Sequence, residues 1–252
     1  DLIIQLTPFN KHLSDLVKQK YPKCRNIFVK YGHEYYNDLQ RLLPKGQNNV
    51  CHSPKGYNID ELWICADYEP TKYYYQALYD GAEVNICPFI WKSDNLRLSP
   101  FTQMDYNDSS NEKNIYIVEP NINILKTGLI PILIVNELWK RNPDSFNKVY
   151  IIGHNNYRDN EYFQKELLPK IEVLNGKHNK VFFCPRATVN DIFRKPGILL
   201  SHQENWGLNY IYLEALYLKI QWVHNSPFFK DVGYYYTDKN VFEGADKLEK
   251  AL

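Results

Sequence analysis

The 252-residue chain lacks the short motifs that mark several large enzyme classes. It contains no GxGxxG and no GxxxxGK followed by Ser or Thr, so the phosphate-binding turns of dinucleotide-binding and P-loop proteins are missing. It also contains no GxSxG, the turn that presents the serine of α/β-hydrolases. These absences argue against dinucleotide redox chemistry, P-loop hydrolysis and serine-hydrolase chemistry.

Cysteine is scarce, charge of one sign is not in excess, and long apolar runs are missing. The five cysteines form no CxxC and no Cys/His ligand spacing, which argues against a zinc site and favours reduced thiols in the cytoplasm. A net charge of +1, from 30 basic and 29 acidic residues, predicts no nucleic-acid partner. The longest apolar runs, such as residues 129–135, are too short to span a bilayer.

What the chain does contain is a regular alternation of apolar strands and helical patterns. Strands are predicted at residues 2–6, 26–31, 61–65, 83–87, 115–118, 149–152, 180–183, 198–200 and 221–224. Helices are predicted at residues 12–19, 34–43, 71–79, 128–141, 162–168, 189–193, 209–218 and 245–252. This alternation predicts an α/β fold with parallel sheets covered by helices. The number of strands is too large for one such sheet at this length, which favours two Rossmann-like domains.

The break between the domains is predicted in a segment without apolar periodicity that is rich in Asn, Ser and Asp. We expect an N-terminal, acceptor-side domain over residues 1–97, a linker over 98–113 and a C-terminal, nucleotide-sugar-binding domain over 114–252. The first domain shows fewer strands than a doubly wound domain usually has, and the sequence opens inside a strand. We therefore expect this domain to be incomplete at its N-terminus.

Basic side chains follow several predicted strands. In open α/β sheets, ligands bind beyond the carboxyl ends of the strands, where helix N-termini present free N–H groups. Lys126 precedes a predicted helix and can meet a phosphate there, although a solvated lysine is the alternative. Arg186 can reach a diphosphate, although a surface or ion-paired arginine is the alternative. His33 follows Gly32 at a strand end and is either a ligand-facing or a structural histidine.

Polar residues are most concentrated within residues 201–227. An apolar strand enters a loop that holds Gln203 and Glu204, and a helix that begins near Asn209 carries Glu214. A partly buried carboxylate on this helix can accept hydrogen bonds from two vicinal hydroxyls, as on a ribose. The alternative is an exposed glutamate on the polar face of the helix.

Taken together, these residues resemble the retaining nucleotide-sugar glycosyltransferases of the two-Rossmann (GT-B) type. In that family the first strand of the donor domain leads through a loop with Arg and Lys into a helix, and here IYIV leads through EPNINIL to Lys126. The strings SHQENWGL and LEAL resemble the family's later signature and the helix that follows it. VEPNINILKTG, SHQENWGLNYIYLEAL, VHNSP, GYYY, DELWICADY and CPFIW look like a poorly characterised family of bacterial and viral glycosyltransferase-like proteins, over nearly the whole chain.

The resemblance implies transfer of a sugar from a nucleotide diphosphate-sugar donor to a glycan or other acceptor, with retention of configuration and without a metal or cofactor. It assigns the leaving diphosphate to Lys126, Arg186 and the helix N-terminus near Asn209. The family's phosphate-binding arginine falls near Asn121, which departs from the pattern. Lys126 and Arg186 would then share the diphosphate. No oligomeric state is predicted.

The same resemblance assigns the ribose to Glu214 and the sugar hydroxyls to Gln203 and Glu204. It places His33 on the acceptor side, with His33 and Glu204 as the catalytic residues. The family's two glutamates stand eight residues apart, whereas Glu204 and Glu214 are ten apart (214 − 204 = 10). Either two residues are inserted before the helix, or Trp206 occupies the position of the first glutamate.

These departures leave other functions open. One is a non-catalytic nucleotide-sugar or carbohydrate-binding module on the same fold. Another is a sugar phosphorylase or epimerase, because a fold does not fix the reaction that it supports.

Overall fold

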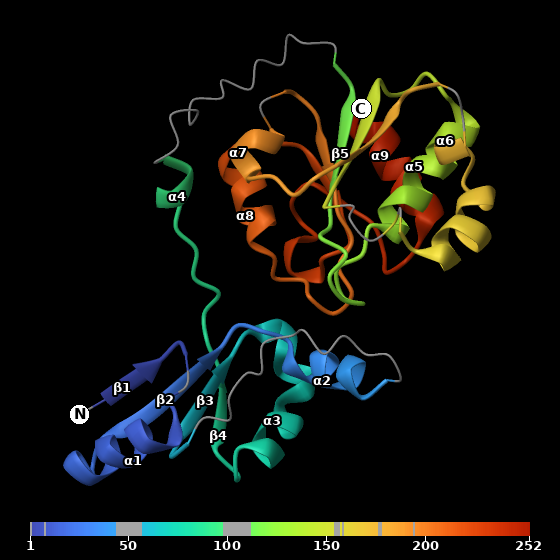
Figure 1. The fold of residues 1–252 in the computed structure, drawn as a ribbon. Coiled ribbons are helices and arrows are strands. Elements are labelled where there is room, and N and C mark those ends of the chain that lie inside the picture. The colour runs from blue at the N-terminus through green and yellow to red at the C-terminus, as the bar shows by residue number, and fades with distance from the viewer. Residues whose placement is uncertain are drawn as a thin grey trace. The chain divides into compact units, whose positions relative to one another are not determined.

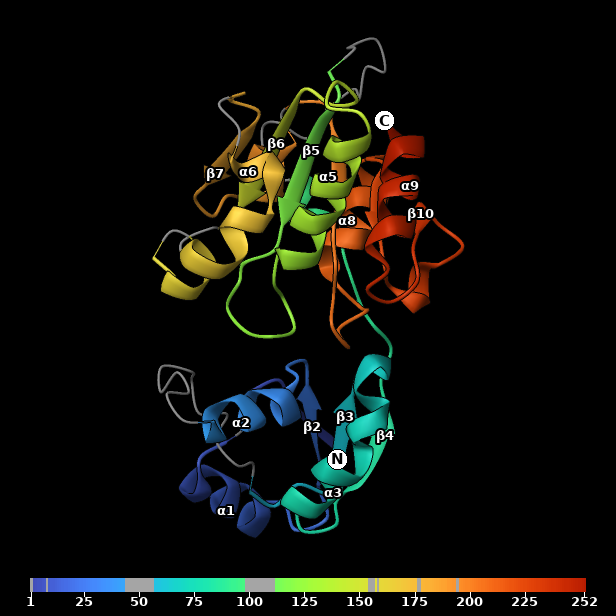
Figure 2. The same cartoon turned by 90° about the vertical axis from the view of Figure 1, so that its right-hand side faces the viewer.

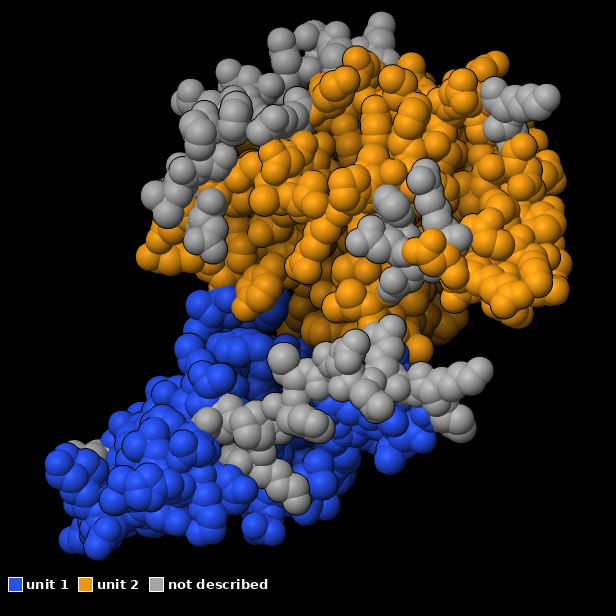
Figure 3. All heavy atoms as spheres, in the orientation of Figure 1, with its two compact units in different colours: residues 1–90 blue, residues 91–252 orange. Residues whose placement is uncertain are grey.

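A computed structural model describes residues 2–7, 9–43, 57–97, 112–153, 157, 159–175, 178–193 and 195–252. The chain divides into two compact units, Asp1–Ile90 and Trp91–Leu252 (Figures 1 and 3). The division lies before the end of the predicted domain 1–97. Most of the predicted linker, residues 98–111, lies outside the described residues.

In its described residues, unit 1 contains a parallel sheet with the strand order β1-β2-β3-β4. The strands are β1 (Leu2–Gln5), β2 (Arg25–Lys30), β3 (Glu61–Ile64) and β4 (Glu83–Ile86). The connections contain α1 (Lys11–Lys20), α2 (Glu34–Leu42), the 3₁₀ turn η1 (Ala66–Thr71) and α3 (Lys72–Leu78). Each predicted strand of this unit matches an observed one to within about one residue at either end.

Unit 2 contains a second parallel sheet, with the strand order β10-β9-β8-β5-β6-β7. The strands are β5 (Asn114–Val118), β6 (Lys148–Ile152), β7 (Val181–Cys184), β8 (Ile198–Leu200), β9 (Trp222–His224) and β10 (Tyr234–Tyr235). The helices are α4 (Asp94–Arg97), α5 (Leu129–Arg141), α6 (Glu172–Asn175), α7 (Val189–Ile192), α8 (Tyr210–Tyr217) and α9 (Val241–Ala251). Short helical turns are η2 (Phe163–Leu167), η3 (Leu168–Lys170) and η4 (Pro227–Phe229).

The strand order of unit 2 reverses between β5 and β8. From β5 the chain continues to β6 and β7 on one side, and it then returns to β8 on the other side of β5. Figure 1 shows α5 and α9 on one side of β5 and α8 on the other, and Figure 2 shows the molecule from the side that α5 and α9 cover. The loops that leave β5 and β8 both begin at the carboxyl edge of the sheet beside this reversal, which is where open α/β sheets bind ligands.

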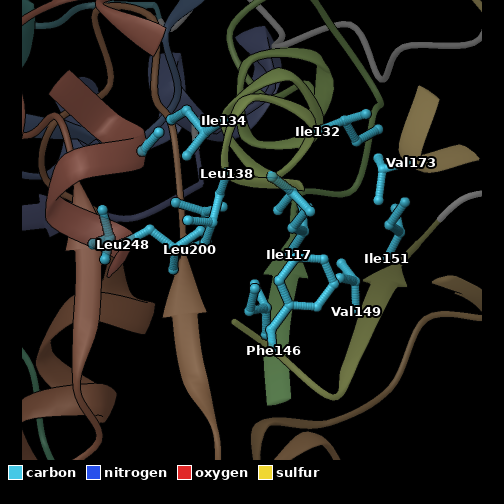
Figure 4. Packing of buried hydrophobic residues seen from close by; sticks show 14 of the residues in the cluster. Ile117, Ile132, Ile134, Leu138, Phe146, Val149, Ile151, Val173, Leu200 and Leu248 are labelled. Atoms are coloured by element: carbon cyan, nitrogen blue, oxygen red, sulfur yellow. The ribbon is translucent and has the colours of Figure 1, made fainter. Parts of the chain in front are cut away.

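Both faces of the unit 2 sheet are buried. One face packs against α5 and α9 in a cluster that includes Ile117, Leu138, Phe146, Leu200 and Leu248 (Figure 4). The other face packs against α7 and α8 in a cluster that includes Tyr116, Leu199, Tyr212 and Trp222. Successive residues fall in different clusters because side chains alternate along a strand. Among the described residues, no helix is long and apolar enough to cross a membrane.

Candidate functional site

The site lies where two loops of unit 2 meet, beside the reversal of strand order. One loop follows β5 and the other follows β8. The backbone N–H of Glu204 donates to the carbonyl oxygen of Leu125 at 3.1 Å. The Nζ atom of Lys126 lies 4.2 Å from the centre of the Trp206 ring. The fold thus brings together Lys126 and Glu204, two candidates from distant parts of the sequence.

Asn121 shapes the loop that carries Lys126. Its φ angle of 51° lies in the left-handed region, which Asn tolerates better than most residues. The Nδ2 atom of Asn121 donates to the carbonyl oxygen of Glu119 at 3.1 Å, and its Oδ1 atom accepts the N–H of Gly128 at 2.8 Å. The side chain of Asn121, a predicted donor-binding residue, therefore bridges the two ends of this loop.

Glu119, directly after β5, is a buried carboxyl that the sequence analysis did not select. Its side chain accepts hydrogen bonds from the Ser201 hydroxyl at 2.6 Å, the Gln203 Nε2 atom at 2.8 Å and the His202 backbone N–H at 3.3 Å. Burial raises the pKa of Glu119 to about 7, against the opposing effects of the Ser201 hydrogen bond and the charge of Lys126. A carboxyl that changes charge near neutral pH thus lies beneath the loop after β8.

The backbone of Gln203 is held on its other side by Asn225. The Asn225 Oδ1 atom accepts the N–H of Gln203, and the Asn225 Nδ2 atom donates to the carbonyl oxygen of Gln203, both at 2.9 Å. The Gln203 side chain is buried, and its Oε1 atom accepts no hydrogen bond from the described residues. Gln203 therefore has a fixed backbone and one polar atom that is left for a water molecule or a ligand.

Glu204 takes part in a hydrogen-bonded chain at the rim of the same loop. Its carboxylate pairs with His202 Nε2 at 3.0 Å and with Lys239 Nζ at 2.8 Å. The other ring nitrogen of His202 lies 2.9 Å from the Tyr236 hydroxyl. Burial lowers the pKa of His202, although the hydrogen bond to Glu204 opposes it. For Glu204, burial acts to raise the pKa, but the hydrogen bonds from Lys239 and His202 outweigh it and lower the pKa.

Asn209 and Glu214 lie at the start and in the middle of α8. Asn209 is the N-cap residue, and its Oδ1 atom accepts the N–H of Ile211 at 3.4 Å. Glu214 is half-buried, and burial raises the pKa of its carboxyl. Within the described residues, no side chain forms an ion pair with Glu214. Its two carboxylate oxygens are therefore available to a ligand with hydroxyl groups.

The remaining two candidates lie apart from these loops in the chain. Arg186 is exposed and follows β7, the strand at the opposite end of the sheet from β10. His33 belongs to unit 1, where it precedes α2 and is buried against the rings of Tyr36 and Tyr68, with both ring centres at 4.5 Å. Among the residues described, no group of three or more His, Cys, Asp or Glu side chains could hold a metal ion.

The whole chain, residues 1–252, matches the model of a family described as "Protein of unknown function (DUF2827)". The chain belongs to the DUF2827 family. No curated protein matches the sequence of this DUF2827 chain.

Solved structures place this DUF2827 protein in a fold class. It is similar to the N-terminal domain of Candida albicans trehalose-6-phosphate phosphatase, with a TM-score of 0.62, 12% identity and coverage of 100% of this chain and 62% of that chain. An α,α-trehalose-phosphate synthase (UDP-forming) from Burkholderia xenovorans gives a TM-score of 0.59, 12% identity and coverage of 100% and 65%. The corresponding synthase from Burkholderia multivorans gives a TM-score of 0.58 and 13% identity, with coverage of 100% of this chain and 62% of that chain.

At these identities, the likeness concerns the fold alone. It confirms the predicted GT-B fold class, with parallel α/β sheets. The DUF2827 chain spans less than two thirds of the length of each of these three proteins.

Proposed function

We propose that this DUF2827 protein is a glycosyltransferase that moves a sugar from a nucleotide diphosphate-sugar donor to a glycan or other acceptor, without a metal. The supporting observation is the junction of the loops after β5 and β8, which the hydrogen bond from Glu204 to Leu125 and the contact of Lys126 with Trp206 hold together beside the reversal of strand order. This is the place at which an open α/β sheet binds its ligand. The scattered cysteines support a cytoplasmic location for this activity.

The leaving diphosphate is assigned to groups that carry positive charge. Lys126 supplies a full charge, and the N-terminus of α8, behind Asn209, supplies N–H groups and the positive end of the helix dipole. Arg186 is exposed and forms no ion pair within the described residues, so its guanidinium is available to an anion. Charge that develops on the leaving group is then stabilised without a metal.

The sugar and the ribose are assigned to acceptor groups. Glu214 would accept hydrogen bonds from the two ribose hydroxyls, because its half-buried carboxylate has no ion-pair partner among the described residues. Gln203 and Glu204 would contact the sugar hydroxyls. His33 is assigned to the acceptor side from the resemblance, as is retention of the anomeric configuration.

Calorimetric titration with a panel of nucleotide diphosphate-sugars tests this proposal. Lys126→Met should weaken donor binding about 10–100-fold and Glu214→Gln about 10-fold, as expected for charge-assisted hydrogen bonds. The matched controls Lys250→Met and Glu249→Gln change exposed residues of α9 and should leave the affinity unchanged. If both site variants bind the donor as tightly as the wild type, the assigned roles are wrong.

A non-catalytic nucleotide-sugar-binding protein is the second candidate. The observation in its favour is that Glu204 pairs with His202 and Lys239, while Trp206 stands eight residues before Glu214 (214 − 206 = 8). Slow hydrolysis of a bound donor without acceptor separates the two functions. A transferase releases free sugar over hours, whereas a protein that only binds the donor releases none above the buffer rate.

A further inference from the structure

The buried pair Glu119 and Gln203 has two possible hydrogen-bond arrangements. Glu119 is 1% exposed and Gln203 4% exposed, so no ligand reaches the Glu119 carboxyl directly. One carboxyl oxygen of Glu119 accepts from Ser201 and His202, and the other accepts from Gln203 Nε2. All three of these donors belong to the loop after β8. Glu119 therefore holds the loop after β8 in place through three hydrogen bonds.

The Gln203 amide has a donor end and an acceptor end, and only one of them faces Glu119. An ionised carboxylate can only accept hydrogen bonds, so it requires the NH₂ end of the amide, as observed at 2.8 Å. The carbonyl end, Oε1, then has no hydrogen-bond donor among the described residues. A protonated carboxyl can donate instead, so half a turn of the amide would direct Oε1 toward Glu119 and free the NH₂ end.

We propose that Glu119 is a positioning residue that sets the orientation of the Gln203 amide, and that a bound diphosphate selects the protonated form of Glu119. This inference rests on the proposed donor site, since it takes the ligand near Lys126 to be a nucleotide diphosphate-sugar. The proton comes from solvent and remains on the Glu119 carboxyl while the donor is bound. In that state the buried amide directs its NH₂ end, which is the positive end of its dipole, away from Glu119, and this suits an anionic ligand beside the loop.

The charges around Glu119 also favour its protonation when the donor binds. The charge of Lys126 stabilises the ionised form of Glu119. A diphosphate that engages Lys126 offsets this effect and adds negative charge near the carboxyl, so donor binding should be accompanied by proton uptake. By linkage, affinity for the donor must then rise as pH falls through the pKa of Glu119. With that pKa at about 7, both protonation states are populated near neutral pH.

Other titratable groups also face Glu119. They are Lys126 before α5, Tyr157 after β6, His202 after β8, Tyr212 in α8 and Tyr236 after β10. Burial raises the pKa of Tyr157, Tyr212 and Tyr236, so these phenols stay neutral. Burial lowers the pKa of His202 below its ordinary value, so this imidazole titrates at more acidic pH.

Nuclear magnetic resonance tests the amide orientation without any ligand. The 252-residue chain is labelled with ¹⁵N-glutamine, the side-chain signal of Gln203 is assigned by its loss in Gln203→Leu, and pH is varied from about 5.5 to 8.5 across the pKa of Glu119. The wild type should show a shift of this signal with a midpoint near pH 7. Glu119→Gln should abolish the transition, because the introduced amide can donate to Oε1 of Gln203 at every pH.

The pH dependence of the Gln203 side-chain signal either supports or overturns the role of Glu119. A transition that is missing in the wild type, or one that persists in Glu119→Gln, overturns the proposal. A midpoint well below pH 6.5 also overturns it, since the signal would then follow His202. The Glu119→Gln variant is suited to this test because it is close in shape and removes a buried charge, so it should fold.

Donor binding supplies an independent test with UDP-glucose, whose diphosphate does not titrate near neutral pH. If only the protonated form binds, affinity should be about tenfold higher at pH 6 than at pH 8, and Glu119→Gln should bind equally at both pH values. Equal wild-type affinities at the two pH values would overturn the linkage. If UDP-glucose binds at neither pH, the same titration is made with the member of the panel that binds, and if none binds the proposed donor is wrong, while the Gln203 signal still decides the role of Glu119.

Discussion

The ammonium group of Lys126 lies 4.2 Å from the centre of the Trp206 ring, and this contact joins the two loops of the candidate site. Trp206 stands eight residues before Glu214, which is the spacing of the two glutamates in the glycosyltransferases that the sequence resembles. One of the two alternatives that the resemblance leaves open therefore places Trp206 at the position of the first glutamate. This cation–π contact places the ammonium group of Lys126 against the face of the Trp206 ring.

The first prediction concerns this contact. Trp206→Leu should weaken donor binding about 2–5-fold, because a partly exposed cation–π contact contributes about 0.5–1 kcal/mol to the positioning of the lysine. Trp206→Phe keeps an aromatic face and should lose less. Calorimetric titration of both variants measures the effect. An unchanged affinity in Trp206→Leu would show that the ring does not position Lys126.

The second prediction concerns stability and pH. The pKa of Glu119 is raised from its unfolded value of 4.5 to about 7 in the folded protein, so protonation of Glu119 stabilises the folded state. This contribution is complete below pH 4.5 and is lost as pH rises toward 7. Glu119→Gln should remove this pH dependence. Relative to the wild type, its free energy of unfolding at pH 8 should be higher by up to about 3 kcal/mol than the same difference at low pH.

Urea unfolding at pH 5 and pH 8 provides the measurement, with Glu249→Gln on the exposed surface of α9 as the control. The difference between Glu119→Gln and the wild type should increase with pH, whereas Glu249→Gln should follow the wild type. If the difference is the same at both pH values, Glu119 is not a buried acid with a raised pKa.

Local sequence patterns were sufficient to predict most of the fold. Apolar runs located the strands, because buried parallel strands consist almost entirely of apolar residues. They missed β10, which has two residues and depends on its pairing with β9. The helix predicted at 245–252 begins earlier, at Val241. The missed signal is Asn240, whose side chain accepts the N–H of Glu243 as an N-cap.

The candidate site was less predictable, because its geometry depends on contacts between distant segments. Glu119 follows an apolar strand, but its burial depends on Ser201 and Gln203, which approach it only because β8 pairs with β5. Asn121 was selected for a ligand role, yet the structure shows its side chain bonded to the loop itself. A single sequence gives no indication of such partners.

The third prediction concerns the packing of α9 on α5. In an ordinary helix, Gly→Ala stabilises by about 1 kcal/mol. A Cβ atom on Gly244 would lie 2.5 Å from the Cδ1 atom and 2.8 Å from the Cγ1 atom of Ile134, so Gly244→Ala should instead destabilise unit 2 by about 1–3 kcal/mol. Gly32→Ala is the control, since a Cβ atom there meets nothing within 4 Å. Urea unfolding decides the sign, and a stabilised Gly244→Ala would contradict the close approach.

The fourth prediction separates the two roles of Asn121, its left-handed backbone and its side-chain hydrogen bonds. Asn121→Gly keeps the φ angle of 51° without strain but loses the bonds to Glu119 and Gly128, whereas Asn121→Ala loses the bonds and adds strain. Asn121→Ala should therefore be the less stable variant by about 1 kcal/mol in urea unfolding. Both variants should bind the donor more weakly, because both loosen the loop that carries Lys126. If Asn121 instead contacts the diphosphate directly, Asn121→Gly should lose donor affinity while its stability stays at the wild-type level, since the bonds within the loop would then contribute nothing to folding.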